Sequence, residues 1–226
     1  MEIVPIAFAH NGYKEKFGIP RQSGRAASVI TRIVMTKQFG TDDSVRGIQQ
    51  FSHIWLIWGF SENHHWSPTV RPPRLGGNKR IGVFATRSSF RPNSLALSVV
   101  KLISVEKNSN GEIVLVVGGA DMMDNTPIFD IKPYIPYADC VSNASGGFAS
   151  AGEDYRLEVE IPQTIMNMLS EQQKQDLTDI LAQDPRPAYH NDQREYGLTY
   201  DNMNVKFKVI DGVLYVTDCK QINDLR

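Results

Sequence analysis

From Met1 to about Asp139 the chain consists mainly of short apolar segments separated by turn residues. Segments rich in β-branched or aromatic side chains read IVPIAFA, ASVITRIVM, HIWLIWGF, IGVFATR, LALSVVKLISVE and EIVLVVGGADM. Many short segments of this kind, with few helical patterns among them, are typical of a barrel or sandwich and not of alternating β–α units. The sequence therefore predicts a mainly β fold built on a small β-barrel.

The rest of the chain has a different pattern. YRLEVEI predicts a strand, Ser170 and Gln173 have the spacing of a helix capping box, and Asp211-Gly212 between alternating segments predicts a two-residue hairpin. The stretch before them, SNASGGFASAGED, is small and polar, as linkers are. We therefore predict a β-barrel domain over residues 1–141, a linker over 142–154 and a small C-terminal α+β domain over 155–226.

Charge is distributed unevenly, although the net charge is only −1. No carboxylate occurs between Glu62 and Glu106. The basic residues of that interval are Arg71, Arg74, Lys79, Arg80, Arg87, Arg91 and Lys101, with His64 and His65. Such a stretch creates a local field suited to phosphates or another polyanion, unless acidic residues from elsewhere in the fold pair with it.

Motifs that mark several common enzyme classes are missing. There is no G-x-G-x-x-G after a strand, no P-loop, no H-E-x-x-H and no G-x-S-x-G, so neither a Rossmann nucleotide site nor a serine hydrolase is predicted. Cys140 and Cys219 lack metal-ligand spacing and suit a reduced, cytoplasmic protein without a metal. No apolar run is long enough to span a membrane, so we expect no membrane partner.

Four stretches next to predicted strands carry most of the chemistry. They are KFGIPRQSGRA, the segment that begins at His53, the ATRSSFRPNS stretch around Arg87 and Arg91, and ADMMDNTPIFDIKPYIP. Arginines grip carboxylates or phosphates, Asp and Asn accept from hydroxyls or an adenine amine, and Phe17, Phe84 and Phe90 suit an aromatic base. Each stretch also has a structural interpretation, as a strand-edge histidine, a surface arginine or an ordinary turn.

Several long blocks resemble the TrmO (YaeB-like) family of tRNA methyltransferases. They include YKEKFGIPRQ, FSHIW, TVRPPRLGGNKRIGVFATRSSFRPNSLALS, DNTPIFDIKPYIPYAD and LAQDPRPAYH. The resemblance implies an S-adenosylmethionine-dependent enzyme on a small, non-Rossmann β-barrel. It implies methylation of N6 of threonylcarbamoyladenosine at position 37, in the anticodon loop of a threonine tRNA. It also implies a cytoplasmic homodimer with the methyl donor near the subunit interface.

The same resemblance assigns site residues. The expected cofactor-binding residues are Pro20, Arg21, Gln22, Arg91, Asn93, Ser94, Asp124, Asn125, Thr126 and Pro127. Asn125 stands where many relatives have Gly, and Ser94 where they commonly have Pro. By the same resemblance, Asp184, Arg186 and Tyr189 belong to a C-terminal motif expected to face substrate RNA or complete the active site. The chemistry of the reaction adds Arg87 and His53 as expected catalytic residues. An arginine (Arg87, Arg91 or Arg186) would hold the threonyl carboxylate or polarise the carbonyl, and Asp184 or His53 would accept a proton.

Two other functions stay open on the residues alone. The arginine-rich interval equally suits a non-enzymatic RNA- or nucleotide-binding barrel, although such a protein has no use for the two expected cofactor loops together. A methyltransferase acting on a different RNA or on a small molecule differs from the tRNA enzyme only through the resemblance.

Overall fold

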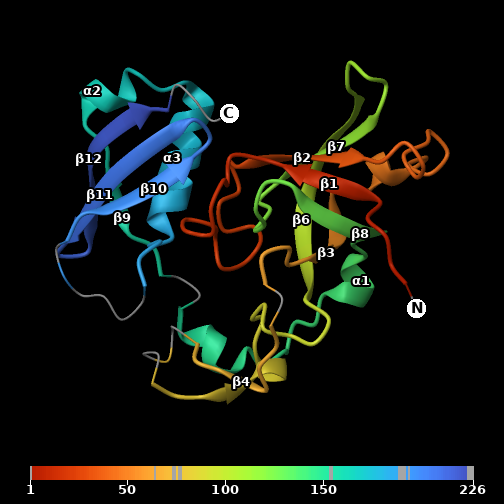
Figure 1. Ribbon diagram of the computed structural model, residues 1–226, viewed down its shortest axis with the longest axis horizontal. Coiled ribbons are helices and arrows are strands. Elements are labelled where there is room, and N and C mark those ends of the chain that lie inside the picture. Colours follow the sequence, from red (N-terminus) through yellow and green to blue (C-terminus); the bar gives the residue numbers. More distant parts are fainter. Residues whose placement is uncertain are drawn as a thin grey trace.

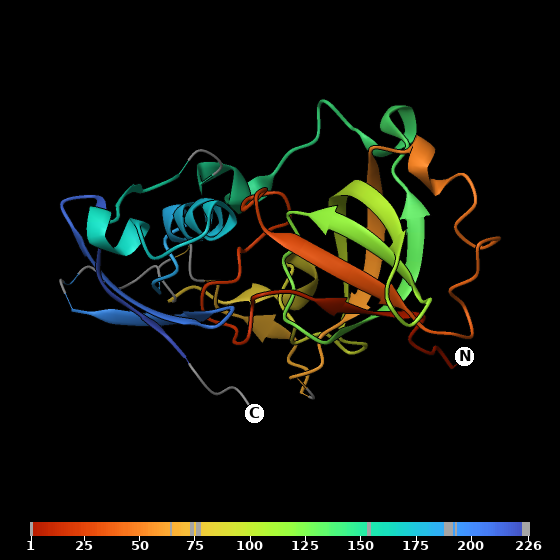
Figure 2. The same ribbon diagram turned by 90° about the horizontal axis from the view of Figure 1, so that it is seen from above.

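The structure is a computed structural model that describes residues 2–63, 65–72, 75, 78–152, 155–187, 192 and 194–222. Two units lie side by side in both views (Figures 1 and 2). The strands are β1 (Ala7–His10), β2 (Ile30–Met35), β3 (His53–Gly59), β4 (Thr69–Val70), β5 (Ile81–Gly82), β6 (Leu95–Lys107), β7 (Ile113–Gly118), β8 (Thr126–Pro133), β9 (Glu158–Glu160), β10 (Tyr196–Tyr200), β11 (Met203–Ile210) and β12 (Val213–Gln221). The helices are α1 (Pro136–Asp139), α2 (Gln163–Met166) and α3 (Glu171–Ala182), and the 3-10 turns are η1 (Ile48–Gln50), η3 (Val83–Ala85) and η4 (Gly147–Gly152).

The first unit is a closed barrel with the strand order β1-β2-β7-β6-β3-β8. Every second side chain of β3, namely Ile54, Leu56 and Trp58, is buried. This alternation follows from the two-residue period of a strand whose one face lines the barrel interior. The closed barrel confirms the predicted fold class.

One segment that was predicted as a strand stays outside the barrel. In IGVFATR only Ile81–Gly82 is extended, where β5 pairs with β4, and Val83–Ala85 turns into η3. The polar residues that follow, up to Ser94, therefore form a loop beside the barrel and not a strand in its wall.

The second unit is a four-stranded sheet, in the order β10-β11-β12-β9, packed with α3. Asp211 and Gly212 both have positive φ, as the predicted two-residue hairpin requires. Ser170 Oγ accepts from the Gln173 amide at 3.2 Å, and the Gln173 side chain accepts from the Ser170 amide at 3.1 Å. The predicted capping box is therefore present.

The loop between β1 and β2 belongs partly to the core of the second unit. Tyr13, Ala26 and Val29, which all precede β2, are buried among side chains of α3 and β10–β12. Tyr13 packs edge-on against Tyr200 with 5.5 Å between the ring centroids. This packing holds the loop of residues 13–29 between the two units.

Candidate active site

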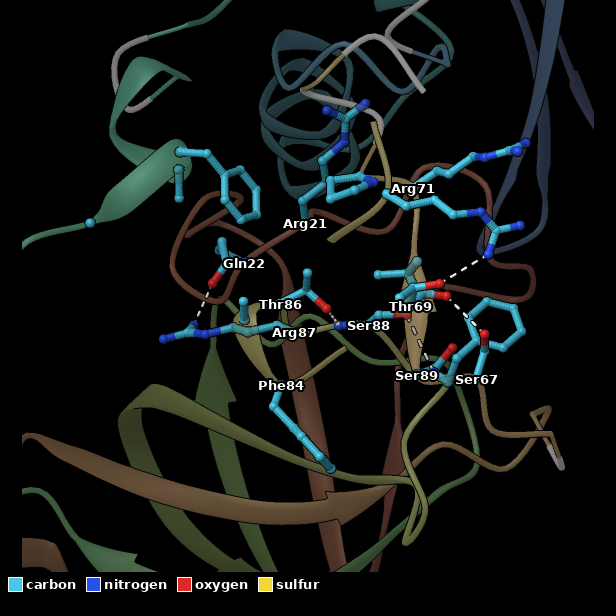
Figure 3. A pocket seen from close by; sticks show the side chains of 18 of the residues that line it. Arg21, Gln22, Ser67, Thr69, Arg71, Phe84, Thr86, Arg87, Ser88 and Ser89 are labelled. Atoms are coloured by element: carbon cyan, nitrogen blue, oxygen red, sulfur yellow. Dashed lines mark hydrogen bonds between the residues drawn. The ribbon is translucent and has the colours of Figure 1, made fainter. Parts of the chain in front are cut away.

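A large cavity of about 1220 Å³ lies against the loop of residues 13–29 (Figure 3). It is lined by parts of that loop, by described residues that lie between Ser67 and Phe90, and by residues between Gly146 and Ser150, which fall within the predicted linker. Its described lining contains no carboxylate and five arginines: Arg21, Arg25, Arg71, Arg80 and Arg87. Phe84, Phe90 and Phe148 add apolar surface. A cavity of this composition attracts anions and offers aromatic faces to a flat ligand.

Hydrogen bonds connect the walls of the large cavity. The Arg87 guanidinium donates to the side-chain carbonyl of Gln22, and Arg80 Nη1 donates to Thr69 Oγ1 at 2.9 Å. Arg21 Nη2 donates to the backbone carbonyl of Arg186 at 3.3 Å, which joins the loop to the C-terminal unit. Residues from three distant parts of the sequence are therefore held in one site.

Arg91 supports the loop behind the large cavity and is not part of its lining. Arg91 Nη1 donates to the backbone carbonyls of Val83 at 3.2 Å and Thr86 at 2.7 Å. Its guanidinium lies 5.6 Å from the centroid of the Phe84 ring. These contacts hold Phe84, which is 74% exposed, toward the cavity.

Asn93 and Ser94 continue this turn toward β6. Asn93 is exposed, and Ser94 Oγ donates to the Asn63 carbonyl at 3.3 Å. Ser94 has φ 45°, a conformation that a proline ring cannot adopt. The backbone that the loop has here therefore excludes proline at this position.

A small cavity of about 200 Å³ adjoins the large one and shares Ser89 with it. Its lining includes Trp58, Glu62, Asp121 and Thr126. The Ser98 hydroxyl donates to Asp121 Oδ1 at 2.5 Å, and Trp58 Nε1 donates to Ser98 Oγ at 2.9 Å. Burial raises the pKa of the Asp121 carboxyl above its usual range, although the Ser98 hydrogen bond and the nearby Arg87 charge act in the opposite direction.

Asp121 was not among the predicted site residues. It follows β7 directly after Gly118, Gly119 and Ala120, at the start of the fourth polar stretch. An acidic residue at the end of a fully buried strand is the signal that could have identified it.

The DNTP turn mainly supports the barrel. Asp124 accepts from the Asn11 amide at 3.1 Å and from Lys14 Nζ at 2.8 Å. Burial alone would raise the pKa of Asp124, but the Lys14 hydrogen bond and charge outweigh it and the pKa is lowered. Asn125 has φ 60°, the left-handed conformation that the sequence suggested it would tolerate.

The next two residues of that turn begin β8. Thr126 is buried at the start of the strand and lines the small cavity, whereas Pro127 pairs with Phe8 of β1. At the other predicted cofactor loop, Pro20 is buried and Arg21 and Gln22 line the large cavity. The predicted cofactor-binding residues thus divide between the two cavities and the barrel that supports them.

The C-terminal motif contains a buried ion pair. Arg186, which is 9% exposed, donates to both oxygens of Asp184 at 2.8 and 2.9 Å, and the Tyr155 hydroxyl donates to Asp184 at 3.0 Å. Burial alone would raise the pKa of Asp184, but the Arg186 contacts prevail and lower it. A carboxylate held in this way is a weak proton acceptor. Tyr189 lies outside the described residues.

Two other aromatic side chains of the prediction lie away from both cavities. His53 is exposed at the first position of β3, whereas Gly59 at the other end of that strand lines the small cavity. A seven-residue strand separates its ends by about 20 Å, so the structure does not bring His53 to the site. Phe17 packs in the second core with its ring 6.4 Å from that of Phe207, and the expectation that it flanks a ligand is wrong.

The described residues hold neither a candidate membrane-spanning helix nor a candidate metal-ligand cluster. In the part of the chain that the structure describes, no helix combines the length and apolar content needed to cross a bilayer. No group of three or more His, Cys, Asp or Glu side chains that could hold a metal was found among the described residues.

The closed barrel, the sheet-and-helix unit and the arginine-lined cavity define a two-unit β-barrel protein whose cavity has the composition of an anion site. Two family models match the chain, the tRNA-methyltransferase O N-terminal domain over residues 8–140 and the TrmO C-terminal domain over residues 154–222. The chain therefore belongs to the tRNA-methyltransferase O (TrmO) family, as the resemblance indicated.

Individual relatives agree with this assignment. The chain is 39% identical to the tRNA (adenine(37)-N6)-methyltransferase of Escherichia coli strain K12, over 91% of this chain and 92% of that protein. It is 43% identical to the protein of the same name from Eikenella corrodens, over 74% and 95% of the two chains. It is 37% identical to a Pseudomonas aeruginosa protein provisionally named an S-adenosylmethionine-dependent methyltransferase, over 90% of each.

A solved structure shows the same architecture. The crystal structure of TrmO from Pseudomonas aeruginosa superposes on this chain with a TM-score of 0.78, at 30% sequence identity. The superposition covers 97% of this chain and 98% of that one.

Proposed function

We propose that this chain transfers a methyl group from S-adenosylmethionine to N6 of adenosine 37 in a tRNA. Within that activity, we propose threonylcarbamoyladenosine in a threonine tRNA as the substrate. The observation that carries the proposal is the large cavity, whose described lining combines five arginines with three phenylalanines and no carboxylate. Membership of a methyltransferase family distinguishes this use of the cavity from binding alone.

The large cavity suits the single-stranded loop of a tRNA. Guanidinium groups pair with phosphates in forked geometry, and exposed aromatic rings stack on unpaired bases. Phe84 and Phe90, which are 74% and 44% exposed, line the cavity beside Arg87. The threonyl carboxylate of the modified adenosine would also find an arginine partner there.

The small cavity suits part of the methyl donor. When bound, S-adenosylmethionine supplies an electrophilic methyl group on a positively charged sulfur. The carboxylate of Glu62 and the rings of Trp58 and Phe60 line this cavity, and such groups favour a cation. Its volume of about 200 Å³ is below the roughly 300–1,000 Å³ of ligand pockets, so the remainder of the donor would extend past Ser89 into the large cavity.

Two further expectations form part of the proposal. The family resemblance supports a homodimer, which light scattering of the purified protein tests directly. A cytoplasmic location agrees with Cys140 and Cys219 both being free thiols. Localisation of a fluorescent fusion in the producing organism tests it.

Nucleoside mass spectrometry tests the proposed activity. The protein is incubated with S-adenosylmethionine and threonine tRNA that carries threonylcarbamoyladenosine, and in parallel with the same tRNA lacking that modification. We expect methylated threonylcarbamoyladenosine in the first reaction only. Methylation of both tRNAs would retain the enzyme class and reject the finer substrate, whereas tRNA binding without methylation would indicate the non-enzymatic barrel.

A further inference from the structure

We propose that Asp121 is the catalytic residue that accepts the N6 proton during methyl transfer, and that Ser98 is its positioning residue. This inference rests on the proposed function and concerns the same site. The inference depends on three observations: the Asp121 carboxylate lines the small cavity, it lies close enough to Arg87 of the large cavity to feel its charge, and the Ser98 hydroxyl donates to it.

The position of Asp121 places it between the two ligands of the proposed reaction. It lines the small cavity, and both Arg87 and the backbone amide of Ser23 are close enough to influence its ionisation. Arg87 lines the large cavity, and the adjacent Gln22 does so too. In the proposed reaction, N6 of the adenosine enters from the large cavity and the methyl carbon approaches from the small cavity. The Asp121 carboxylate lies near enough to both cavities to reach N6.

A short hydrogen-bond relay fixes the carboxylate. Trp58 Nε1 donates to Ser98 Oγ at 2.9 Å, and Ser98 Oγ donates to Asp121 Oδ1 at 2.5 Å. Trp58 is 6% exposed and Ser98 is 2% exposed, so water has little access to compete for their hydrogen bonds. The relay occupies Oδ1, and it orients the carboxylate by bonds that reach back into the barrel wall.

Several titratable groups lie in or beside the small cavity that Asp121 lines. Lys16 and Glu62 line the same cavity, Arg87 acts from the neighbouring loop, and Tyr13 is close enough that Asp121 contributes to its raised pKa. Burial raises the pKa of Asp121 in spite of Arg87 and Ser98. A base is most effective when its pKa lies near the working pH.

The other acidic candidates are less suitable. Asp184 is held by two bonds from Arg186, and Asp124 is paired with Lys14; both have lowered pKa values. Lowered pKa values weaken both as proton acceptors.

The reaction needs a proton acceptor because the substrate nitrogen loses a proton. The N6 lone pair forms the bond to the methyl carbon while the carbon–sulfur bond breaks and its electron pair remains on sulfur. The N6 proton passes to a carboxylate oxygen of Asp121 and from there to solvent. The neighbouring carbonyl makes N6 acidic enough for a carboxylate to assist.

The proposal is tested by measuring single-turnover methylation of a tRNA that carries threonylcarbamoyladenosine. The Asp121→Asn variant is compared with wild type, and Asp130→Asn on β8 is the matched control. We expect the rate at saturating donor to fall about 100- to 10,000-fold, with donor affinity measured by calorimetry changed less than threefold and the control unaffected. A rate within threefold of wild type would overturn the proposal. So would a loss of donor affinity as large as the loss of rate, because Asp121 would then bind the donor.

Ser98→Ala supplies a second test, with Ser104→Ala on the same strand as control. Removing the Ser98 hydrogen bond should raise the pKa of Asp121, so the acidic limb of the rate profile should move to higher pH. Infrared or NMR titration of isotope-labelled aspartate should show the same displacement without donor or tRNA. An unmoved limb and titration would overturn the assignment even if Asp121→Asn fails to fold. A wild-type protein without activity would instead reject the proposed function.

Discussion

The Arg87 guanidinium donates to the side-chain carbonyl of Gln22, and this bond joins two loops that both line the large cavity (Figure 3). The two residues are far apart in sequence. Because Arg87 also lies near Asp121, one side chain links the surface that suits RNA to the carboxylate that we assign to proton transfer.

Arg87→Ala should weaken tRNA binding about 10- to 100-fold, the loss expected when a charged hydrogen-bond donor to phosphate is removed. Arg46→Ala is a matched control because Arg46 is exposed and pairs with Asp43 outside both cavities. Filter binding at fixed salt measures the effect. Equal affinities for the two variants would exclude Arg87 from the RNA surface.

Binding of tRNA should depend steeply on ionic strength. Each phosphate neutralised in a single-stranded segment contributes about −0.7 to the slope of log affinity against log salt. Substituting Arg80 or Arg87 should remove about one phosphate contact each, so each substitution should make that slope shallower by about 0.7. A slope that is near zero for the wild type would contradict the assignment of the large cavity to RNA.

Phe84→Ala should weaken tRNA binding by about 1–3 kcal/mol if one base stacks on the ring. The thermal midpoint should change little, since the side chain is 74% exposed. Tyr137→Ala is the matched control, because Tyr137 is 91% exposed and lines neither cavity. Calorimetric titration with an anticodon stem-loop distinguishes the two variants.

Asp184→Ala should lower the free energy of unfolding by about 3 kcal/mol, because it leaves the Arg186 charge buried without its partner. The pKa of Asp184 is lowered in the folded chain, so the stabilisation is present above its unfolded value of about 3.9. It is lost as the pH falls through the folded value.

Urea unfolding of wild type and Asp184→Ala at neutral pH and near pH 3 checks this prediction. The difference between the two proteins should be largest at neutral pH and smaller in acid. A difference that grows on acidification would show that Asp184 is not held as a carboxylate.

Local features of the fold could be predicted from the sequence. The hairpin at Asp211-Gly212 and the capping box at Ser170 depend on neighbouring residues only, and both are present. The departure of residues 83–87 from the predicted strand IGVFATR could not be foreseen, because their apolar and β-branched residues also suit a strand.

The site was predictable in part. Arg21, Gln22 and Arg87 line one cavity as their polar context suggested. The role of Arg91 as a support for Val83 and Thr86, and the contact of Ser98 with Asp121, depend on distances between segments that no local pattern reveals. The sequence alone therefore did not distinguish Asp121 from the other residues of its polar stretch, because only the fold shows that Ser98 lies beside it.

The placement of Tyr13, Ala26 and Val29 in the core of the second unit limits how the protein can be shortened. A truncated form that ends near residue 141 would leave these apolar side chains facing water on the very loop that carries Arg21 and Gln22. Such a fragment would tend to self-associate and to lose the shape of that loop. The boundary seen in the sequence is thus a poor place to cut the molecule for crystallisation or reuse.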